Sequence, residues 1–412
     1  MDPLIIVPLV IVVALFFDFT NGFHDTANAM ATPIATGAMK PKTAVTVAAI
    51  MNLLGAFLST QVSLTISKGI LNDDPSSGGS LIQPEIIFAA LTGAILWNLL
   101  TWLFGLPSSS SHALFGGLIG AAVVAMGFSS VHFDKVVEKV LIPALFAPLI
   151  AGLASALATL TAYIITGRSE GARKKNGIAT GRGKFKIGQI FSSSLLALSH
   201  GTNDAQKTMG IITLVLVSAG LVTKDAPVQF WVILASALAI AIGTYTGGWR
   251  IIKTMGSGLS EIRPAQGFAA EISSGATILS SSFLGFALST TQVASGSVIG
   301  SGIGRRGAQV RWNKAGQIAL GWLVTLPASA IVGGASAYLV HTFGITGLII
   351  DGIILLLAAY GIFRVSARNK VSSRHVAPSE VEVAAATALR SPRQVRTEAA
   401  KAAKAAKGKG KK

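Results

Sequence analysis

Long apolar runs dominate this chain and restrict its fold more than any other feature. Windows of about 20 apolar residues are long enough to cross a bilayer as an α-helix, and they occur here at 4–23, 43–66, 139–166, 187–220, 228–246, 314–340 and 345–363. Of the 412 residues, 51% are hydrophobic and only 12% are charged, and the mean hydropathy is +0.62. These values exclude an ordinary soluble globular protein and predict an all-α polytopic membrane protein.

The positive charge predicts how the chain is oriented in the membrane. Lys and Arg gather in the segments 40–42, 167–186 and 305–314, and 13 of them lie in the tail, 364–412. Under the positive-inside rule these segments face the cytoplasm. We therefore expect a multi-pass protein of the plasma (inner) membrane with its N-terminus outside and its C-terminal tail inside. The Lys- and Ala-rich tail is predicted to be disordered, with no specific nucleic acid partner.

Two blocks of sequence recur in the second half of the chain. NGFHDTANAM (21–30) returns as HGTNDAQKTM (200–209), 179 positions later, and GLPSSSSHALFGGLIG (105–120) returns as GFALSTTQVASGSVIG (285–300), 180 positions later. Two separated blocks with nearly the same offset indicate a duplication. Because the loop charges make the first copy enter from outside and the second from inside, the copies are predicted to be inverted, as in secondary transporters that bind their substrate near the bilayer midplane.

These features divide the chain into five predicted parts. They are a first membrane repeat (1–166), a basic cytoplasmic linker (167–186), a second, inverted membrane repeat (187–340), an extra C-terminal span (341–363) and a disordered basic cytoplasmic tail (364–412).

Each copy of the first block places acidic and amide side chains inside an apolar segment. Gly, Asn and Asp are poor residues for a helix interior, so we expect the helices to break at NGFHD and at HGTND, near the midplane. The freed carbonyls, the carboxylates and the amides would be hard oxygen ligands for a small coupling cation. The predicted ligands are Asp25, Asn28, Asp204 and Asn203. The alternative is that each Asp only caps the half-helix that follows it.

Each copy of the second block places hydroxyl side chains between two apolar arms. The arms are 85–104 with 113–127 and 265–284 with 293–303, and they predict two re-entrant helical hairpins. A helix that begins at each tip offers unpaired N–H groups to an anion, and hydroxyls add donors for a tetrahedral oxyanion. The predicted anion ligands are Ser109, Ser110, Ser111, Ser289, Thr290 and Thr291. Alternatively, these residues only cap the arms or help helices to pack.

Other polar residues in apolar segments are candidates for a proton or substrate relay. They are His24, His200, Glu271 and Gln206. His24, next to Asp25, suits a proton role, although it could instead bond to a carbonyl. Glu271 is either a proton acceptor or an interfacial anchor, and Lys207 is expected to snorkel toward the interface.

An enzyme is disfavoured. Neighbours such as Ser111 and His112 project about 100° apart on a helix, which is poor geometry for a nucleophile and its base. The absence of cysteine excludes disulfides, Cys-ligated zinc and Cys nucleophiles. No metal centre and no cofactor are expected, apart from the small coupling cation.

The motifs NGFHDTAN, HGTNDAQK, GLPSSSSH and GFALSTTQ resemble the duplicated signatures of the inorganic phosphate transporter (PiT) family, in an order and spacing that cover residues 4 to about 363. The resemblance implies a secondary symporter for inorganic phosphate, coupled to H+ or Na+. It also implies cation binding at Asp25 and Asp204 and phosphate binding by the hairpin hydroxyls. Ala287 and Gln292 depart from the family pattern.

The remaining alternatives concern the substrate and the ion. With His24, the first motif is similar to that of bacterial members of the family described as proton-coupled carriers of phosphate or of a neutral metal–phosphate complex. The sequence leaves open a symporter for another oxyanion such as sulfate, or an anion channel. Membrane lipid is an expected partner, and a homo-oligomer is compatible with the sequence.

Overall fold

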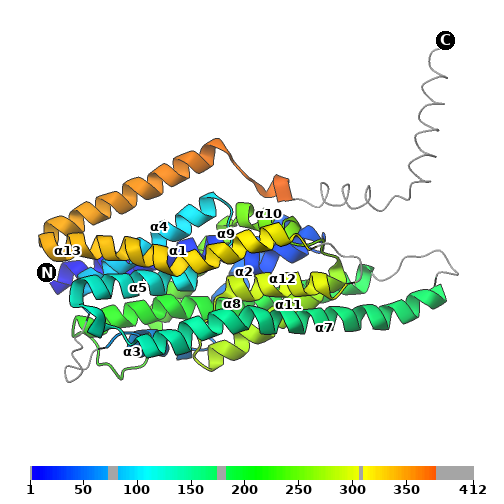
Figure 1. Ribbon diagram of the computed structural model, residues 1–412, viewed down its shortest axis with the longest axis horizontal. Coiled ribbons are helices and arrows are strands. Elements are labelled where there is room, and N and C mark those ends of the chain that lie inside the picture. Colours follow the sequence, from blue (N-terminus) through cyan, green and yellow to red (C-terminus); the bar gives the residue numbers. More distant parts are fainter. Residues whose placement is uncertain (1, 73–81, 174–181, 306–309, 377–412) are drawn as a thin grey trace, which may run out of the picture.

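The computed structural model describes residues 2–72, 82–173, 182–305 and 310–376, and in these ranges the chain folds as helices without a β-sheet (Figure 1). The helices are α1 (Pro3–Ala35), α2 (Pro41–Gly55), α3 (Gln61–Gly69), α4 (Pro84–Leu103), α5 (Ser110–Met126), α6 (Phe133–Val136), α7 (Ile142–Arg173), α8 (Arg182–Ser218), α9 (Phe230–Thr246), α10 (Trp249–Ser257), α11 (Pro264–Phe283), α12 (Thr290–Ile303) and α13 (Trp312–Arg368). The short turns are η2 (Phe128–Ser130), the π-helical η3 (Val137–Leu141) and η5 (Ser373–Val376).

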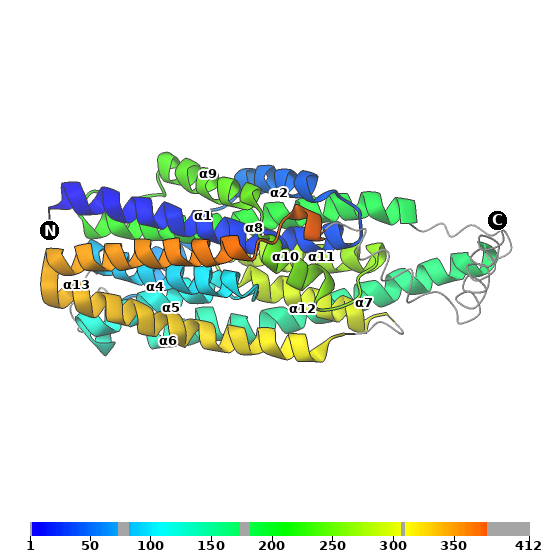
Figure 2. The same ribbon diagram turned by 90° about the horizontal axis from the view of Figure 1, so that it is seen from above.

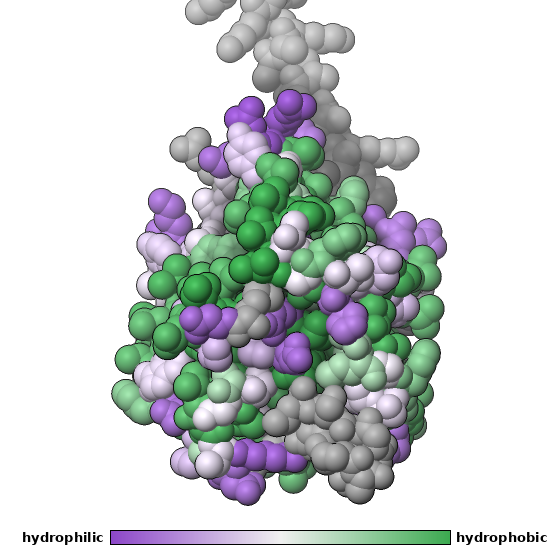
Figure 3. All heavy atoms as spheres, turned by 90° about the vertical axis from the view of Figure 1, so that its left-hand side faces the viewer, coloured by the Kyte–Doolittle hydropathy of each residue, from purple (hydrophilic) through white to green (hydrophobic). Residues whose placement is uncertain are grey.

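The helices form an elongated bundle whose outer surface is apolar. Most of the long helices lie along the long axis of the molecule (Figures 1 and 2). Large aliphatic side chains of α7 and α13 face outward; Leu153 is 64% exposed and Leu323 is 75% exposed. Viewed from one end, hydrophobic residues occupy much of the perimeter (Figure 3). In the described part of the chain, four helices are long and apolar enough to span a membrane, or five if the bent pair α9–α10 counts as one span. This is an integral membrane protein.

Helices α1 and α8 cross the centre of the bundle without a break. At about 1.5 Å per residue, their 33 and 37 residues exceed the hydrocarbon thickness of about 30 Å. The predicted interruption at NGFHD and HGTND is wrong, because both segments remain helical. Their glycines serve close packing instead: a Cβ on Gly22 would lie 2.4 Å from the carbonyl oxygen of Ile240, and one on Gly201 would lie 2.3 Å from that of Asn52.

Contacts between α1 and α8 show that the two helices run antiparallel. Thr36 bonds to Gln189 near one end of the pair, Asp25 meets His200 in the middle, and Asn21 bonds to Asp204 further along. The residue number therefore rises along α1 as it falls along α8. This arrangement brings the two copies of the acidic motif face to face.

The interruptions in the helices occur elsewhere. Helices α9 and α10 meet at an angle of 69°, at Gly247, whose φ of +75° few residues other than glycine adopt. In the first half of the chain, α2 and α3 are separated by residues 56–60. Gly344 has a φ of +56° and divides the long α13 into two arms.

Helices α4 and α5 form one helical hairpin, and α11 and α12 form another. The first helix of each hairpin has 20 residues and begins with a proline, and each turn contains a glycine with positive φ, Gly105 or Gly285. The hairpins lie in opposite halves of the bundle (Figure 2). Their tips meet, because the Ser111 hydroxyl donates to the Leu288 carbonyl at 3.0 Å.

Candidate functional site

A polar cluster lies at the centre of the bundle, where α1 and α8 meet the tips of the two hairpins. Its side chains are almost completely removed from solvent: Asp25 is 1% exposed, Asp204 0%, His200 1%, Ser110 2% and Thr290 1%. Because buried polar groups are costly unless they are paired, the contacts inside this cluster define it.

The carboxylate of Asp25 on α1 is surrounded by donors from both hairpins. Ser110 donates to Oδ2 at 3.0 Å, and Thr291 donates to Oδ1 at 3.3 Å. The Nδ1 atom of His24 lies 2.5 Å from Oδ1. The other ring nitrogen of His24, Nε2, lies 3.3 Å from the Ser108 hydroxyl. The first acidic motif is therefore bonded to the hairpin tips and is not free to act as a helix cap.

The carboxylate of Asp204 on α8 is paired with two basic side chains from its own helix. The Nε2 atom of His200 lies 3.0 Å from Oδ2, and the ammonium of Lys207 forms an ion pair with Oδ1. Asn21 of α1 donates to Oδ2 at 3.4 Å. Lys207 is 0% exposed, so the predicted snorkelling is wrong; the Asp204 carboxylate holds the ammonium inside the bundle.

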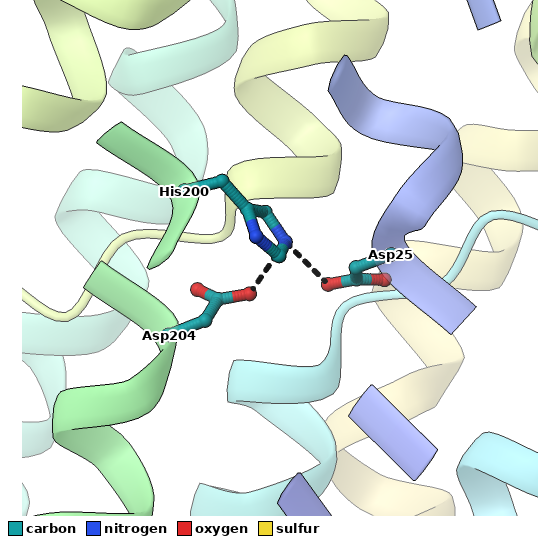
Figure 4. A group of neighbouring side chains, drawn as sticks. All are labelled: Asp25, His200 and Asp204. Atoms are coloured by element: carbon teal, nitrogen blue, oxygen red, sulfur yellow. Dashed lines mark ion pairs between the residues drawn. The ribbon is translucent and has the colours of Figure 1, made fainter. Parts of the chain in front are cut away.

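His200 connects the two acidic motifs. Its Nε2 lies 3.0 Å from Asp204 and 4.0 Å from Oδ2 of Asp25 (Figure 4). One ligand atom from each of Asp25, His200 and Asp204 can be chosen so that all three lie within 4.8 Å of one another. Two carboxylate oxygens and an imidazole suit a small cation or a shared proton.

Thr290 at the tip of the second hairpin also lies between the two acids. Its hydroxyl is 3.4 Å from Oδ2 of Asp25 and 3.2 Å from Oδ2 of Asp204. Asn28 approaches from α1, and its amide donates to Thr290 at 3.3 Å and to Thr291 at 3.0 Å. Three residues predicted for the cation therefore share one cluster with three predicted for the anion: Asp25, Asn28 and Asp204 with Ser110, Thr290 and Thr291.

The other three predicted hairpin hydroxyls differ in their contacts. Ser109 and Ser289 are the N-caps of α5 and α12, where they accept from the backbone N–H of His112 and of Gln292. The Ser111 hydroxyl bonds to the opposite hairpin tip, as described above. Ser109 and Ser289 thus make the capping contacts that the alternative interpretation predicted, whereas Ser110, Thr290 and Thr291 face the carboxylates.

Asn203 and Gln206 make contacts away from the carboxylates. Asn203 donates to the Ser282 hydroxyl at 2.9 Å, near the turn of the second hairpin. The Gln206 side chain accepts from the backbone N–H of Val62 at 2.8 Å, at the first turn of α3. Asn203 nevertheless leaves its carbonyl oxygen buried without a hydrogen bond among the described residues.

Glu271 lies in a different buried cluster. Its carboxylate accepts from Thr32 at 2.6 Å, from Gln189 at 2.9 Å and from Ser192. These donors come from α1 and α8, so Glu271 ties α11 to both central helices.

The sequence interpretation assigned no role to several polar neighbours of the cluster. Thr101 bonds to Ser108 at 2.7 Å, and Asn21 bonds to Asp204. Asp18 is 0% exposed, and neither of its oxygens has a hydrogen-bond partner in the described part of the chain. Asp18 lies on α1 seven positions before Asp25, two helical turns away on the same face, and this spacing is the signal that could have identified it.

Comparisons with known proteins identify the family of this chain. The model of the phosphate transporter family matches residues 21–333. The probable low-affinity inorganic phosphate transporter of Mycobacterium tuberculosis is 52% identical over 370 residues, which cover 89% of this chain and 86% of the relative. The protein of the same description from Bacillus subtilis is 40% identical over 345 residues, which cover 83% of this chain and 99% of the relative.

A solved structure shares the fold. It is described as the sodium-dependent phosphate transporter, and it matches with a TM-score of 0.68 at 24% identity, covering 82% of this chain and 100% of that chain. At this level of identity, the match shows a shared fold and nothing about function. The family match and the curated relatives confirm the resemblance of the motifs, and this chain belongs to the phosphate transporter family.

Proposed function

We propose that this protein is a secondary active symporter that imports inorganic phosphate, as the free anion or as a metal–phosphate complex, by alternating access. The observation that carries the proposal is the meeting of two carboxylates, Asp25 and Asp204, with the hydroxyls of two hairpin tips in one buried cluster. Curated relatives at 40 to 52% identity are described as probable low-affinity inorganic phosphate transporters.

The hydrogen bonds of the cluster suggest how cation and phosphate depend on each other. A hydroxyl has one proton to donate, and Ser110, Thr290 and Thr291 direct theirs at Asp25 or Asp204. A cation or proton on Asp25 neutralises the carboxylate and releases Ser110 and Thr291, whose hydroxyls donate to it. The released hydroxyls, together with the N-termini of α5 and α12, then bind a phosphate oxygen. Each ligand thereby raises the affinity for the other, which is the coupling.

We propose H+ as the coupling ion, with Na+ as the alternative that the experiment below distinguishes. Each acidic motif holds an imidazole against its carboxylate: His24 against Asp25 and His200 against Asp204. Imidazoles exchange protons near neutral pH. On this account Asp25 carries the proton, with His24 and His200 beside it, and Asp204 is paired with His200 and Lys207. Asn28 orients Thr290 and Thr291, and Glu271 has a structural role.

Alternating access follows from the duplicated plan. The antiparallel pair α1 and α8 and the two hairpins in opposite halves of the bundle support inverted repeats, with each hairpin re-entering the membrane from its own side. A rocking motion of one repeat against the other would then open the central cluster first to the outside and then to the cytoplasm. The basic segments support a cytoplasmic tail and an outer N-terminus.

Uptake of labelled phosphate into proteoliposomes tests the proposal. The purified protein is given an imposed pH gradient, a sodium gradient or neither, with and without excess sulfate. A proton-coupled phosphate symporter accumulates label with the pH gradient alone, and sulfate does not compete. Accumulation driven only by the sodium gradient would show that Na+ is the coupling ion. Competition by sulfate would show that the substrate is not phosphate alone. If labelled phosphate only equilibrates across the membrane, whichever cation gradient is imposed, the protein is a channel.

A further inference from the structure

Lys207 and Asn28 occupy the same position in the two copies of the acidic motif but differ in charge. The offset of 179 that aligns Asp25 with Asp204 also aligns Asn28 with Lys207. Each acid is thus followed, three positions later and on the same helix face, by a second polar residue that reaches the cluster. The two copies differ at this position by a fixed positive charge.

The two residues also differ in what they contact. The amide of Asn28 donates to the hydroxyls of Thr290 and Thr291, and leaves its own carbonyl oxygen buried without a partner among the described residues. The ammonium of Lys207 forms an ion pair with Oδ1 of Asp204, and both side chains are 0% exposed. A buried Lys is rare unless it is paired. The carboxylate of Asp204 is therefore paired with the positive charge of a side chain of the protein itself.

Two acidic side chains lie near the ammonium of Lys207. Asp204 is in direct contact, and the unpartnered Asp18 is near enough to interact with Lys207, Asp204 and His200 electrostatically. Asp25, by contrast, has His24 beside it and His200 at 4.0 Å, and among the described residues neither a lysine nor an arginine forms an ion pair with it. Within the described ranges, the Asp25 half of the site therefore has no lysine or arginine that corresponds to Lys207 in the Asp204 half.

We propose that Lys207 is a built-in cation that permanently fills the Asp204 half of the site, so that only the Asp25 half takes a mobile coupling cation. This inference rests on the proposed symport function and adds a stoichiometry to it. The chain would move one cation fewer per phosphate than a version with an asparagine at position 207. Asparagine is the natural replacement, because Asn28 is the residue at the same position in the first repeat, three positions after the acid proposed to bind a mobile ion.

The test compares wild type, Lys207→Asn and a control variant in proteoliposomes. Lys135→Asn is the matched control, because Lys135 forms an ion pair with Glu138 at 3.1 Å and the same three-residue spacing but is exposed on the surface. Initial rates of labelled phosphate uptake are measured over a series of proton and of Na+ concentrations, and the cations moved per phosphate are obtained from the membrane potential at which net flux stops.

The expected result is that Lys207→Asn requires about one more cation per phosphate, with a steeper dependence on cation concentration, while Lys135→Asn matches wild type. An unchanged ratio in Lys207→Asn would overturn the inference. If the wild type shows no cation-driven uptake, the proposed function fails instead, so the two failures are distinguishable.

A second variant keeps the inference testable if Lys207→Asn is unstable. The double variant with Asp204→Asn removes both charges of the pair, so its melting temperature should recover toward that of wild type. A double variant that is no more stable than Lys207→Asn would overturn the assignment of Lys207 as the counter-charge of Asp204.

Discussion

The hydroxyl of Ser110 lies 3.0 Å from Oδ2 of Asp25, and this contact joins the tip of the α4–α5 hairpin to α1 across 85 positions of sequence. The second hairpin makes the equivalent approach through Thr290, which reaches both Asp25 and Asp204. The buried cluster is therefore assembled from elements that are distant in sequence, and a displacement of either hairpin would break its hydrogen bonds.

Ser109 and Ser110 are neighbours with different contacts, so their alanine variants should differ in kind. Ser109→Ala removes the N-cap of α5 and should cost about 0.5–2 kcal/mol of stability, measured as a lower melting temperature, with a smaller effect on uptake. Ser110→Ala removes a donor that faces Asp25 and should mainly reduce phosphate uptake. The reverse pattern would contradict the assignment of these two hydroxyls.

Gly22 should tolerate no side chain, because a Cβ there would lie 2.4 Å from the backbone oxygen of Ile240. Gly22→Ala is expected to destabilise the protein by roughly 1–3 kcal/mol through overpacking. Gly316→Ala is the control, because nothing lies within 4 Å of the corresponding Cβ, and it should change stability by about 1 kcal/mol or less. Equal melting temperatures for the two variants would refute the close packing of α1 against α9.

Replacing a carboxylate by an amide should have opposite effects on stability at two buried positions, Glu271 and Asp18. Glu271→Gln replaces an acceptor of three hydrogen bonds with a group that carries its own donors, and should cost roughly 1–3 kcal/mol of stability. Asp18→Asn changes a carboxylate that has no hydrogen-bond partner in the described ranges and should leave the melting temperature equal or higher. A larger loss for Asp18→Asn than for Glu271→Gln would show that the contacts have been assigned wrongly.

Much of the fold follows from periodicity and composition. The apolar windows predicted the long helices, and the duplicated blocks predicted which residues would meet: Asp25, Asp204, Ser110 and Thr290 do lie in one cluster. These features were readable because apolar length and internal repetition are properties of the sequence itself.

The breaks in the helices could not be predicted in the same way. Gly22 and Gly201 are poor helix residues by propensity, yet both lie in continuous helices because a neighbouring backbone packs against them. Gly247 and Gly344 mark real bends and look no different in sequence. Lys207 is a related case, since only the position of Asp204 on the folded helix explains why it stays buried.

The central claim is that the Asp25 carboxylate holds the hairpin hydroxyls until a cation neutralises it. Asp25→Asn mimics the neutralised state, so the folded variant should bind phosphate with little dependence on the coupling cation but should not accumulate it against a gradient.

Binding of labelled phosphate to purified wild type and Asp25→Asn, measured over a series of proton and Na+ concentrations, tests this claim most directly. The account predicts that binding depends on the cation in wild type and loses that dependence in Asp25→Asn. The same cation dependence in both proteins would contradict it.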